Sequence, residues 1–193
     1  MITTWTNWFL KILLEEQKIQ KEELELYQYC VQTMLFQCFV YGLIILLAVC
    51  MDCFATTLFY YLGFLPLRYT AGGFHARTHR GCLLLSIGIY WSSMVLLACL
   101  STQLEKYLAA GMGISILLIV WKTAPIDHAN RLFQKGELVY FRRKSLQAMC
   151  FVTACSLFIS FLSVQLALAI LLGAFCAAIS LLFGKEQRRR ELC

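Results

Sequence analysis

The sequence predicts an all-α, polytopic membrane protein with about six transmembrane helices. Hydrophobic residues make up 60% of the 193 residues and charged residues only 15%, with a mean hydropathy of +0.69. Long uncharged runs recur along the chain, and the basic residues between them fall almost entirely on one side of the expected bundle. A spanning segment must satisfy its own backbone hydrogen bonds in lipid, so such a chain folds as a bundle of helices. We therefore expect one membrane-embedded domain over residues 1–193, with no nucleic-acid partner.

Residues 1–30 have the pattern of an amphipathic region at the bilayer interface. Trp5, Trp8 and Ile12 recur at helical spacing, among glutamates such as Glu15 and Glu16. Tryptophan is common at membrane interfaces, although a soluble helix packed on the loops is an equal alternative. The stretch lacks the basic start, short apolar centre and small-residue cleavage site of a signal peptide, so we expect it in the mature protein.

Apolar runs account for six predicted spans over residues 31–183. A helix of about 20 residues crosses a hydrocarbon core of about 30 Å, and shorter runs rely on flanking side chains that reach the interface. The predicted runs are Val31–Met51, Cys53–Leu67, Cys82–Leu100, Tyr107–Trp121 and Leu146–Phe183. The last run is too long for one crossing and is predicted to turn near Ser163, Val164 and Gln165. A tight hairpin at Asp52 should join the first two, and residues 184–193 should form a basic cytoplasmic tail.

The two prolines mark predicted helix ends. Pro66 and Pro125 each lie at the end of an apolar run, where a polar segment begins. Proline lacks a backbone N–H and restricts the residue before it, so it usually stops a helix. We therefore expect both polar segments to leave the membrane abruptly at these prolines.

The basic residues predict the orientation of the bundle. Positively charged side chains gather in cytoplasmic loops, and six spans place successive loops on alternate sides. Only Lys106 falls on the second side. The first side carries Lys11, Lys18, Lys21, Arg68, Arg77, Arg80, Lys122, Arg131, Lys135, Arg142, Arg143, Lys144, Lys185, Arg188, Arg189 and Arg190. Both termini and residues 67–82 are therefore predicted to be cytoplasmic in a multi-pass protein of the cell membrane, where the cysteines stay mostly reduced.

The polar insert from Leu67 to Cys82, LRYTAGGFHARTHRGC, concentrates the residues that are capable of chemistry. Cys82 begins the next apolar run directly after Gly81, where we expect the unpaired N–H groups and the positive dipole end of a helix. Such a position, with Arg80 nearby, favours the thiolate form that acts as a nucleophile. The other cysteines in apolar runs are better explained as small hydrophobic residues.

Two histidines in this insert are candidate partners for Cys82. His75 lies seven residues before it, so on a straight helix the two residues would be about 10 Å apart along the axis. His79 lies three residues before it and would be closer on a regular helix. Glycines allow the insert to break or to fold back as a re-entrant turn, which would bring His75 to Cys82. Spacing alone leaves the choice open, including an interfacial histidine without a role, and it does not identify a residue that orients His75.

A zinc site of His75, His79 and Cys82 is a rival interpretation, because their spacing places three ligands along one helix face. Arg77 and Arg80 oppose it, since they add positive charge and the insert contains no carboxylate. A small-solute transporter is a second rival, but it would usually need ionisable residues within the spans. We therefore expect neither a metal ion nor a cofactor.

A second predicted cytoplasmic loop, from Lys122 to Lys144, carries six of the seventeen basic residues and two acidic ones. A solvated loop that only marks the cytoplasmic side explains this composition. Arg142, Arg143 and Lys144 would equally attract an acidic peptide or anionic lipid headgroups.

Together these residues resemble the AgrB family, the membrane cysteine endopeptidases of accessory-gene-regulator quorum sensing in Gram-positive bacteria. The resemblance covers nearly the whole chain and rests first on a motif with the order R-x4-G-x-H-x6-C, formed by Arg68, Gly73, His75 and Cys82. It rests also on the apolar span that follows and on a loop with a basic cluster, whose earlier residues include Ala124, Pro125, Asp127 and Asn130.

The resemblance implies a role for each of these residues. Cys82 would be the nucleophile and His75 its partner, whereas Arg68, Gly73 and Gln32 would support the site or bind substrate. The implied substrate is a precursor similar to AgrD, with an amphipathic leader, a short core containing cysteine or serine, and an acidic C-terminal tail. The implied reaction removes the tail through an acyl-enzyme thioester and closes a thiolactone or lactone ring. The chain would then be one peptidase domain, in a homodimer.

Overall fold

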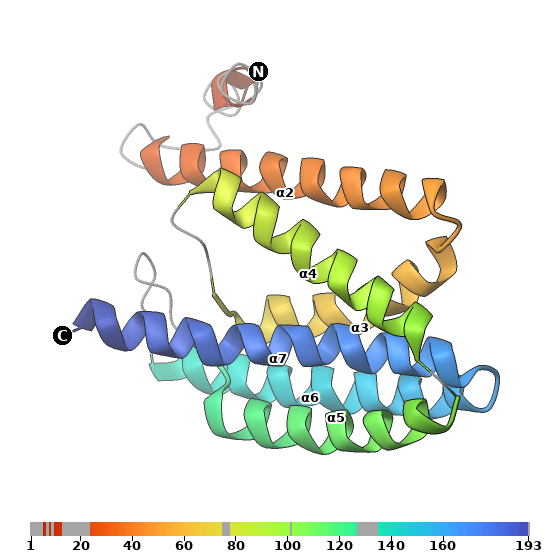
Figure 1. The fold of residues 1–193 in the computed structure, drawn as a ribbon. Helices are drawn as coiled ribbons and strands as arrows, with labels where there is room; N and C mark the ends of the chain where they lie inside the picture. Colours follow the sequence, from red (N-terminus) through yellow and green to blue (C-terminus); the bar gives the residue numbers. More distant parts are fainter. Residues whose placement is uncertain are drawn as a thin grey trace. The chain divides into compact units, whose positions relative to one another are not determined.

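Every element of the computed structural model is an α-helix within the residues that it describes, which are 6, 8, 10–12, 24–74, 78–100, 102–126 and 135–192. In chain order these helices are α2 (Leu24–Cys50), α3 (Phe54–Ala71), α4 (His79–Cys99), α5 (Thr102–Thr123), α6 (Lys135–Ser160) and α7 (Val164–Leu192) (Figure 1). The predicted all-α class is confirmed, and each of the six predicted spans corresponds to one of these helices.

The chain divides into two compact units, Met1–Asp52 and Cys53–Cys193, which are described separately. In the first unit, Trp8 is 59% exposed, whereas Trp5 lies outside the described residues. A small apolar cluster packs a buried side chain of the N-terminal region with residues of α2; its members are Leu10, Leu24, Val31 and Leu35.

The helix α2 crosses the predicted boundary between the amphipathic region and the first span. It begins at Leu24, so one helix contains both the last residues of the predicted amphipathic region and the predicted first span. Neither glycine nor proline, the residues that most disfavour a helix, occurs between Leu24 and Gly42. The helix therefore continues through this stretch.

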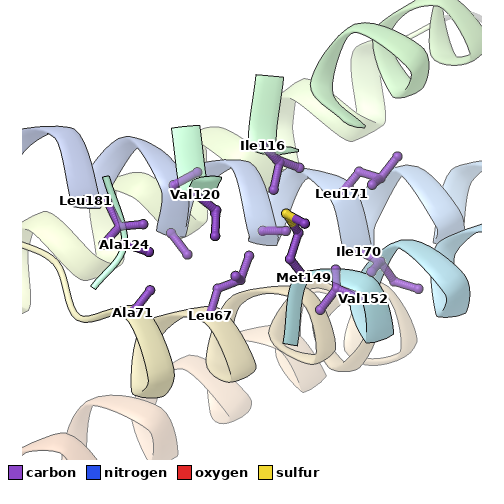
Figure 2. Packing of buried hydrophobic residues seen from close by; sticks show 13 residues of the cluster. Leu67, Ala71, Ile116, Val120, Ala124, Met149, Val152, Ile170, Leu171 and Leu181 are labelled. Atoms are coloured by element: carbon purple, nitrogen blue, oxygen red, sulfur yellow. The ribbon is translucent and has the colours of Figure 1, made fainter. Parts of the chain in front are cut away.

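In the second unit, α7 is the central helix and packs against α3, α4, α5 and α6 (Figure 1). Its apolar residues join those of α3, α5 and α6 in one cluster, shown in Figure 2. The buried members are Leu67, Ala71, Ile116, Val120, Ala124, Met149, Val152, Ile170, Leu171, Ala174, Ala177, Ala178 and Leu181. Several of the α7 members are alanines, and small residues let membrane helices approach one another closely.

The helices α3 and α7 approach each other closely at two buried glycines. A Cβ atom on Gly63 would overlap the backbone carbonyl of Ile170, and a Cβ atom on Gly173 would overlap the carbonyl of Tyr60. Any larger residue at either position would force the backbones apart. This crossing therefore holds α3 against α7 along its middle turns.

Buried polar side chains join α4 to α3 and α7. The hydroxyl groups of Thr57 (2% exposed) and Tyr90 (1% exposed) share a hydrogen bond of 2.7 Å. Thr57 donates its hydroxyl hydrogen to the carbonyl of Cys53 at 2.9 Å, so Tyr90 is the donor in its bond with Thr57. On the α7 side, Ser93 Oγ and Cys176 Sγ lie 3.7 Å apart. These contacts belong to the second half of α4, and the first turns of the same helix carry the predicted nucleophile.

Length and composition suit a multi-pass membrane protein. Within the described part of the chain, the segments long and apolar enough to cross a membrane are Val31–Cys50, Gly81–Cys99 and Val164–Arg190. The apolar part of α5, Tyr107–Thr123, is shorter. α3 contains polar residues such as Thr57 and Tyr60, and the first turns of α6 are charged. The count of six crossings therefore stays a prediction.

Two tight turns lie at or near their predicted positions. Residues 51–53 join α2 to α3, and Asp52 has a φ of 54° there. Residues 161–163 join α6 to α7, and the Ser163 N–H donates to the Ile159 carbonyl at 2.8 Å. The predicted short connection at Asp52 is present, and the predicted turn between the last two helices is confirmed, beginning slightly earlier than expected.

Pro66 does not end its helix, contrary to the prediction. α3 continues to Ala71, which is buried in the apolar cluster. The Pro66 carbonyl accepts a hydrogen bond of 2.7 Å from the Thr70 hydroxyl. Proline removes only its own N–H, so packing of the following turn keeps that turn helical. The prediction for Pro125 is confirmed, because α5 ends at Thr123.

Two segments predicted as a loop and a tail are helical. Residues 135–144 form the first turns of α6, and the basic residues near the C-terminus extend α7 to Leu192. An exposed ion pair of 3.2 Å between Glu186 and Arg190, at helical spacing, supports this extension. Charged residues with good helix propensity continue a helix into water, so a change in composition did not mark the helix end.

Candidate active site

The chain leaves α3 through two glycines with unusual backbone conformations. Gly72 caps the helix with a φ of 84°, and its N–H donates to the Arg68 carbonyl at 3.3 Å. Gly73 follows with a φ of 142° and is buried. Side chains disfavour both conformations, so the glycines allow a direction of exit that other residues would not readily take. The exit brings Phe74, the residue before His75, against α7.

Arg68 and Ser180 hold Phe74 by its backbone. The Phe74 N–H donates to the Ser180 carbonyl at 2.8 Å and to Ser180 Oγ at 3.1 Å. The Phe74 carbonyl accepts from Arg68 Nη2 at 2.6 Å, while Arg68 Nη1 donates to Ser180 Oγ at 2.8 Å. Hydrogen bonds from a charged guanidinium are stronger than those between neutral groups, so Arg68 holds the Phe74 carbonyl firmly, while Ser180 holds the Phe74 N–H.

Two glycines make room for this arrangement. A Cβ atom on Gly73 would overlap the Arg68 guanidinium and lie 2.6 Å from Ser180 Oγ. A Cβ atom on Gly184 would lie 2.8 Å from the Gly73 carbonyl carbon and 2.9 Å from the Phe74 nitrogen. We name these residues the Arg68 clamp; its members are Arg68, Gly73, Phe74, Ser180 and Gly184.

The segment that follows α5 supports the same turn. The Ile126 N–H donates to the Ala71 carbonyl at 3.1 Å, and a Cβ atom on Gly72 would lie 3.1 Å from the Ile126 carbonyl oxygen. Ala124 is buried in the same apolar cluster as Ala71. The two parts of the sequence that carried the family resemblance, around Arg68 and after Ala124, are therefore neighbours in the fold.

Cys82 lies at the end of the first turn of α4. Thr78 is the N-cap residue, and its hydroxyl accepts from the Gly81 N–H at 3.1 Å. The Cys82 N–H donates to the Thr78 carbonyl at 3.0 Å. The expectation that Cys82 begins the helix among unpaired N–H groups is therefore wrong, because Thr78 caps a helix that starts at His79. The thiol is free and half-buried, still near the positive end of the helix dipole.

His75 lies outside the described residues, as do the side chains of His79 and Arg80. The predicted dyad and the rival zinc site therefore stay predictions. One point is decided by the backbone of Thr78, which is extended with φ of −125° and ψ of 145°. The chain from His75 to Cys82 is not one straight helix, so the predicted break is confirmed, while a re-entrant course stays a prediction.

The other predicted site residues lie on different helices. Gln32 is half-buried on α2, in the first unit. Arg142, Arg143 and Lys144 are exposed on α6 instead of lying in a loop, and Lys144 Nζ is 5.6 Å from the centre of the Tyr140 ring. Consecutive residues on a helix point about 100° apart, so these three side chains spread around α6.

The structure brings Arg68 and Gly73 together and adds two residues that the sequence analysis missed, Ser180 and Gly184. Their signal in the sequence is a Ser-x3-Gly pattern at the end of the last apolar run. Small residues at this spacing permit close contact on a membrane helix. Among the described residues, the Cys82 thiol has no hydrogen bond to the Arg68 clamp.

Comparison with known proteins identifies similar sequences. The family model described as Accessory gene regulator B matches residues 3–181. Protein FsrB of Enterococcus faecalis (strain ATCC 47077 / OG1RF) is 28% identical over 155 residues, which cover 79% of this chain. The match covers 64% of FsrB, so the chain spans less than two thirds of the length of that relative. No solved structure matches the chain.

Proposed function

The chain belongs to the accessory gene regulator B family, and from this premise we propose that it is a membrane cysteine endopeptidase for a quorum-sensing precursor peptide. Its substrate is a peptide of the AgrD type, from which it removes the acidic C-terminal tail. Cys82 is the nucleophile and His75 is its partner. The observation that carries the proposal is the Arg68 clamp, in which two members of the R-x4-G-x-H-x6-C motif, Arg68 and Gly73, meet.

The clamp supports an active site because a catalytic side chain works only when it is held in a productive geometry. Arg68 holds the carbonyl of Phe74, and Gly73 permits the close approach, directly before His75 in the sequence. Cys82 contributes a free, half-buried thiol in the first turn of α4.

The first half of the reaction is acyl transfer to the thiol. His75 takes the proton of Cys82, and the thiolate attacks the carbonyl carbon of the peptide bond between the core and the tail. A bond forms between Sγ and this carbon while the carbon–nitrogen bond breaks. His75 then gives its proton to the amine of the departing tail, and the core remains bound to Cys82 as a thioester.

The second half of the reaction closes the ring. A thioester keeps its acyl group activated, so an internal cysteine thiol or serine hydroxyl of the core attacks the same carbonyl carbon. The bond between that carbon and Cys82 Sγ breaks, and a thiolactone or lactone leaves. The proton of the attacking group passes through His75 to the Cys82 sulfur, which restores the enzyme.

Several further parts of the proposal rest on charge and on the family. The exposed cations Arg142, Arg143 and Lys144 attract the acidic tail of the substrate, and Gln32 supports the site. The insert before Cys82 and both termini face the cytoplasm, where the thiol stays reduced. The protein acts as a homodimer, which light scattering of the purified protein in detergent tests directly.

The test is co-expression with an AgrD-type precursor that carries a C-terminal epitope. The wild-type protein should release the tagged tail and yield a cyclic peptide by mass spectrometry. Cys82→Ala and His75→Ala should each lower tail release by at least about 1,000-fold, because each removes a reacting group. His79→Ala is the matched histidine control and Cys99→Ala, at the other end of α4, is the matched cysteine control; both should stay active.

Each other outcome has a defined meaning. Tail release by Cys82→Ala would contradict the cysteine-endopeptidase mechanism. Activity in His75→Ala together with inactivity in His79→Ala would reassign the partner. Inhibition by chelators but not by thiol reagents would favour a zinc site of His75, His79 and Cys82. Movement of a small solute without any release of tail would favour the transporter.

A further inference from the structure

We infer that Ser180 is a positioning residue for His75, acting through Arg68 and the backbone of Phe74. The inference rests on the proposed function, because it takes His75 as the partner of Cys82. Ser180 belongs to the last apolar run, far from the polar insert in the sequence.

Ser180 supplies two acceptors at one point of α7. Its carbonyl and its Oγ both accept from the Phe74 N–H, at 2.8 and 3.1 Å. The same Oγ accepts from Arg68 Nη1 at 2.8 Å, so one hydroxyl joins the guanidinium to the backbone that this guanidinium holds. Without that hydroxyl, Arg68 would lose one of the hydrogen bonds that hold its guanidinium beside the Phe74 carbonyl.

The connection to His75 is covalent. The Phe74 carbonyl carbon is bonded to the His75 nitrogen, and the peptide group between them is planar. The hydrogen bond of 2.6 Å from Arg68 Nη2 fixes the orientation of this plane. Because this peptide group is planar, holding the Phe74 carbonyl restricts the direction in which the chain leaves Phe74.

Close packing around the glycines of the clamp leaves the residues in these contacts little room to move. Gly73 and Gly184 are both buried, and neither has space for a Cβ atom. The Gly63 and Gly173 crossing already joins α3 to α7, so attachment of these two helices does not require the clamp. The clamp instead holds the peptide group that follows Phe74, directly before His75 in the sequence.

A first experiment measures the reactivity of Cys82 in the full-length protein. Iodoacetamide alkylation of Cys82 is followed by mass spectrometry between about pH 6 and pH 10, because a neighbouring imidazole changes the pH dependence of a thiol. His75→Ala should shift the profile. Ser180→Ala should shift it in the same direction and by at least about half as far.

Ser156→Ala is the matched control for the loss of a buried serine. Ser156 is 4% exposed, and its Oγ donates to the Ala167 carbonyl at 3.1 Å, so the variant loses one hydrogen bond between α6 and α7. This bond lies near the start of α7, more than three turns from Ser180. The alkylation profile of Ser156→Ala should match that of the wild type.

A second experiment measures cleavage of the epitope-tagged precursor. Ser180→Ala should lower kcat by about 10- to 100-fold with KM nearly unchanged, the scale expected for a misplaced catalytic group. Ser180→Thr keeps the hydroxyl and should recover most of the rate. The double variant Arg68→Gln with Ser180→Ala should lose no more than the worse single variant, because both remove the same linkage.

The inference is overturned if Ser180→Ala keeps the wild-type profile and rate, or if Ser156→Ala loses as much as Ser180→Ala. If Ser180→Ala does not accumulate in the membrane, Arg68→Gln answers the same question, and a wild-type Cys82 profile in that variant overturns the inference. Failure of the proposed function is separate, since it appears as tail release by Cys82→Ala. A wild-type Ser180→Ala beside an inactive Cys82→Ala overturns only the positioning role.

Discussion

Gly73 combines two constraints at a single residue. Its φ of 142° is a conformation that side chains rarely adopt, and a Cβ atom would overlap the Arg68 guanidinium. Either constraint alone would favour glycine. Together they explain in physical terms why a glycine stands between Arg68 and His75 in the motif.

We predict that Gly73→Ala lowers the rate of tail release by about tenfold or more. The alanine adds backbone strain of about 1–3 kcal/mol and pushes Arg68 from the Phe74 carbonyl. The rate is measured with the epitope-tagged precursor, at equal amounts of membrane-inserted protein. Gly88→Ala on α4 is the control, because nothing lies within 4 Å of its added carbon. A Gly73→Ala variant as active as Gly88→Ala would contradict the prediction.

At the scale of elements, the crossing of α3 and α7 is the contact that least tolerates an added atom. A methyl group on Gly63 would meet the Ile170 carbonyl, which belongs to a helix backbone and cannot rotate away. Overpacking of this kind costs about 1–3 kcal/mol.

We predict that Gly63→Ala lowers the midpoint of thermal unfolding in detergent, followed by the loss of monodisperse protein on heating. Gly111→Ala on α5 is the control, because that position has open space around it. In the control, alanine should be neutral or stabilising by up to about 1 kcal/mol, from its higher helix propensity. Equal midpoints for the two variants would show that the crossing tolerates a wider separation.

The basic residues of α6 lead to a different kind of prediction. Arg142→Glu, Arg143→Glu and Lys144→Glu should each raise KM for the precursor to a different extent, because the three side chains leave the helix in different directions. The effect should shrink as salt rises, since screening limits such attraction to about 10 Å at 0.1 M. KM is measured at low and high salt, and base-for-acid changes in the precursor tail should partly restore cleavage.

The control for this cluster is the rate of Cys82 alkylation, which should not change in the triple variant that combines Arg142→Glu, Arg143→Glu and Lys144→Glu. If the triple variant folds and cleaves normally at low salt, the cluster is only a signal of the cytoplasmic side.

At the scale of the whole molecule, the orientation of α4 in the membrane can be measured by labelling two cysteines. Cys82 and Cys99 lie near its two ends. We predict that a membrane-impermeant maleimide labels Cys99 in intact cells and labels Cys82 only after the cells are permeabilised. The charge distribution of the chain predicts that residues 67–82 lie in the cytoplasm, and a crossing by α4 would then place its other end outside. Labelling is followed by mass spectrometry of the two peptides. The reverse pattern would contradict the orientation, and labelling of both in intact cells would contradict a crossing by α4.

The amino-acid sequence by itself determined the helical class, the positions of the helices and the residues of the motif. Each of these depends on local properties: apolar length, charge, glycine and proline, and the spacing of reactive side chains. The same local reasoning located the turn at Asp52 and the break before Cys82, because both follow from backbone chemistry at those residues. It could also choose Arg68 and Gly73 as site residues, through their resemblance to a family, without explaining what they contact.

Only the tertiary structure decided which distant residues meet. α3 continues past Pro66 because the turn beyond it is buried, and periodicity along one helix does not report the neighbour that buries it. The Arg68 clamp depends on Ser180 and Gly184, which lie on another helix and look like ordinary small residues of an apolar run. Hydrogen bonds between helices depend on how the helices cross, and that crossing is decided by packing of the whole bundle.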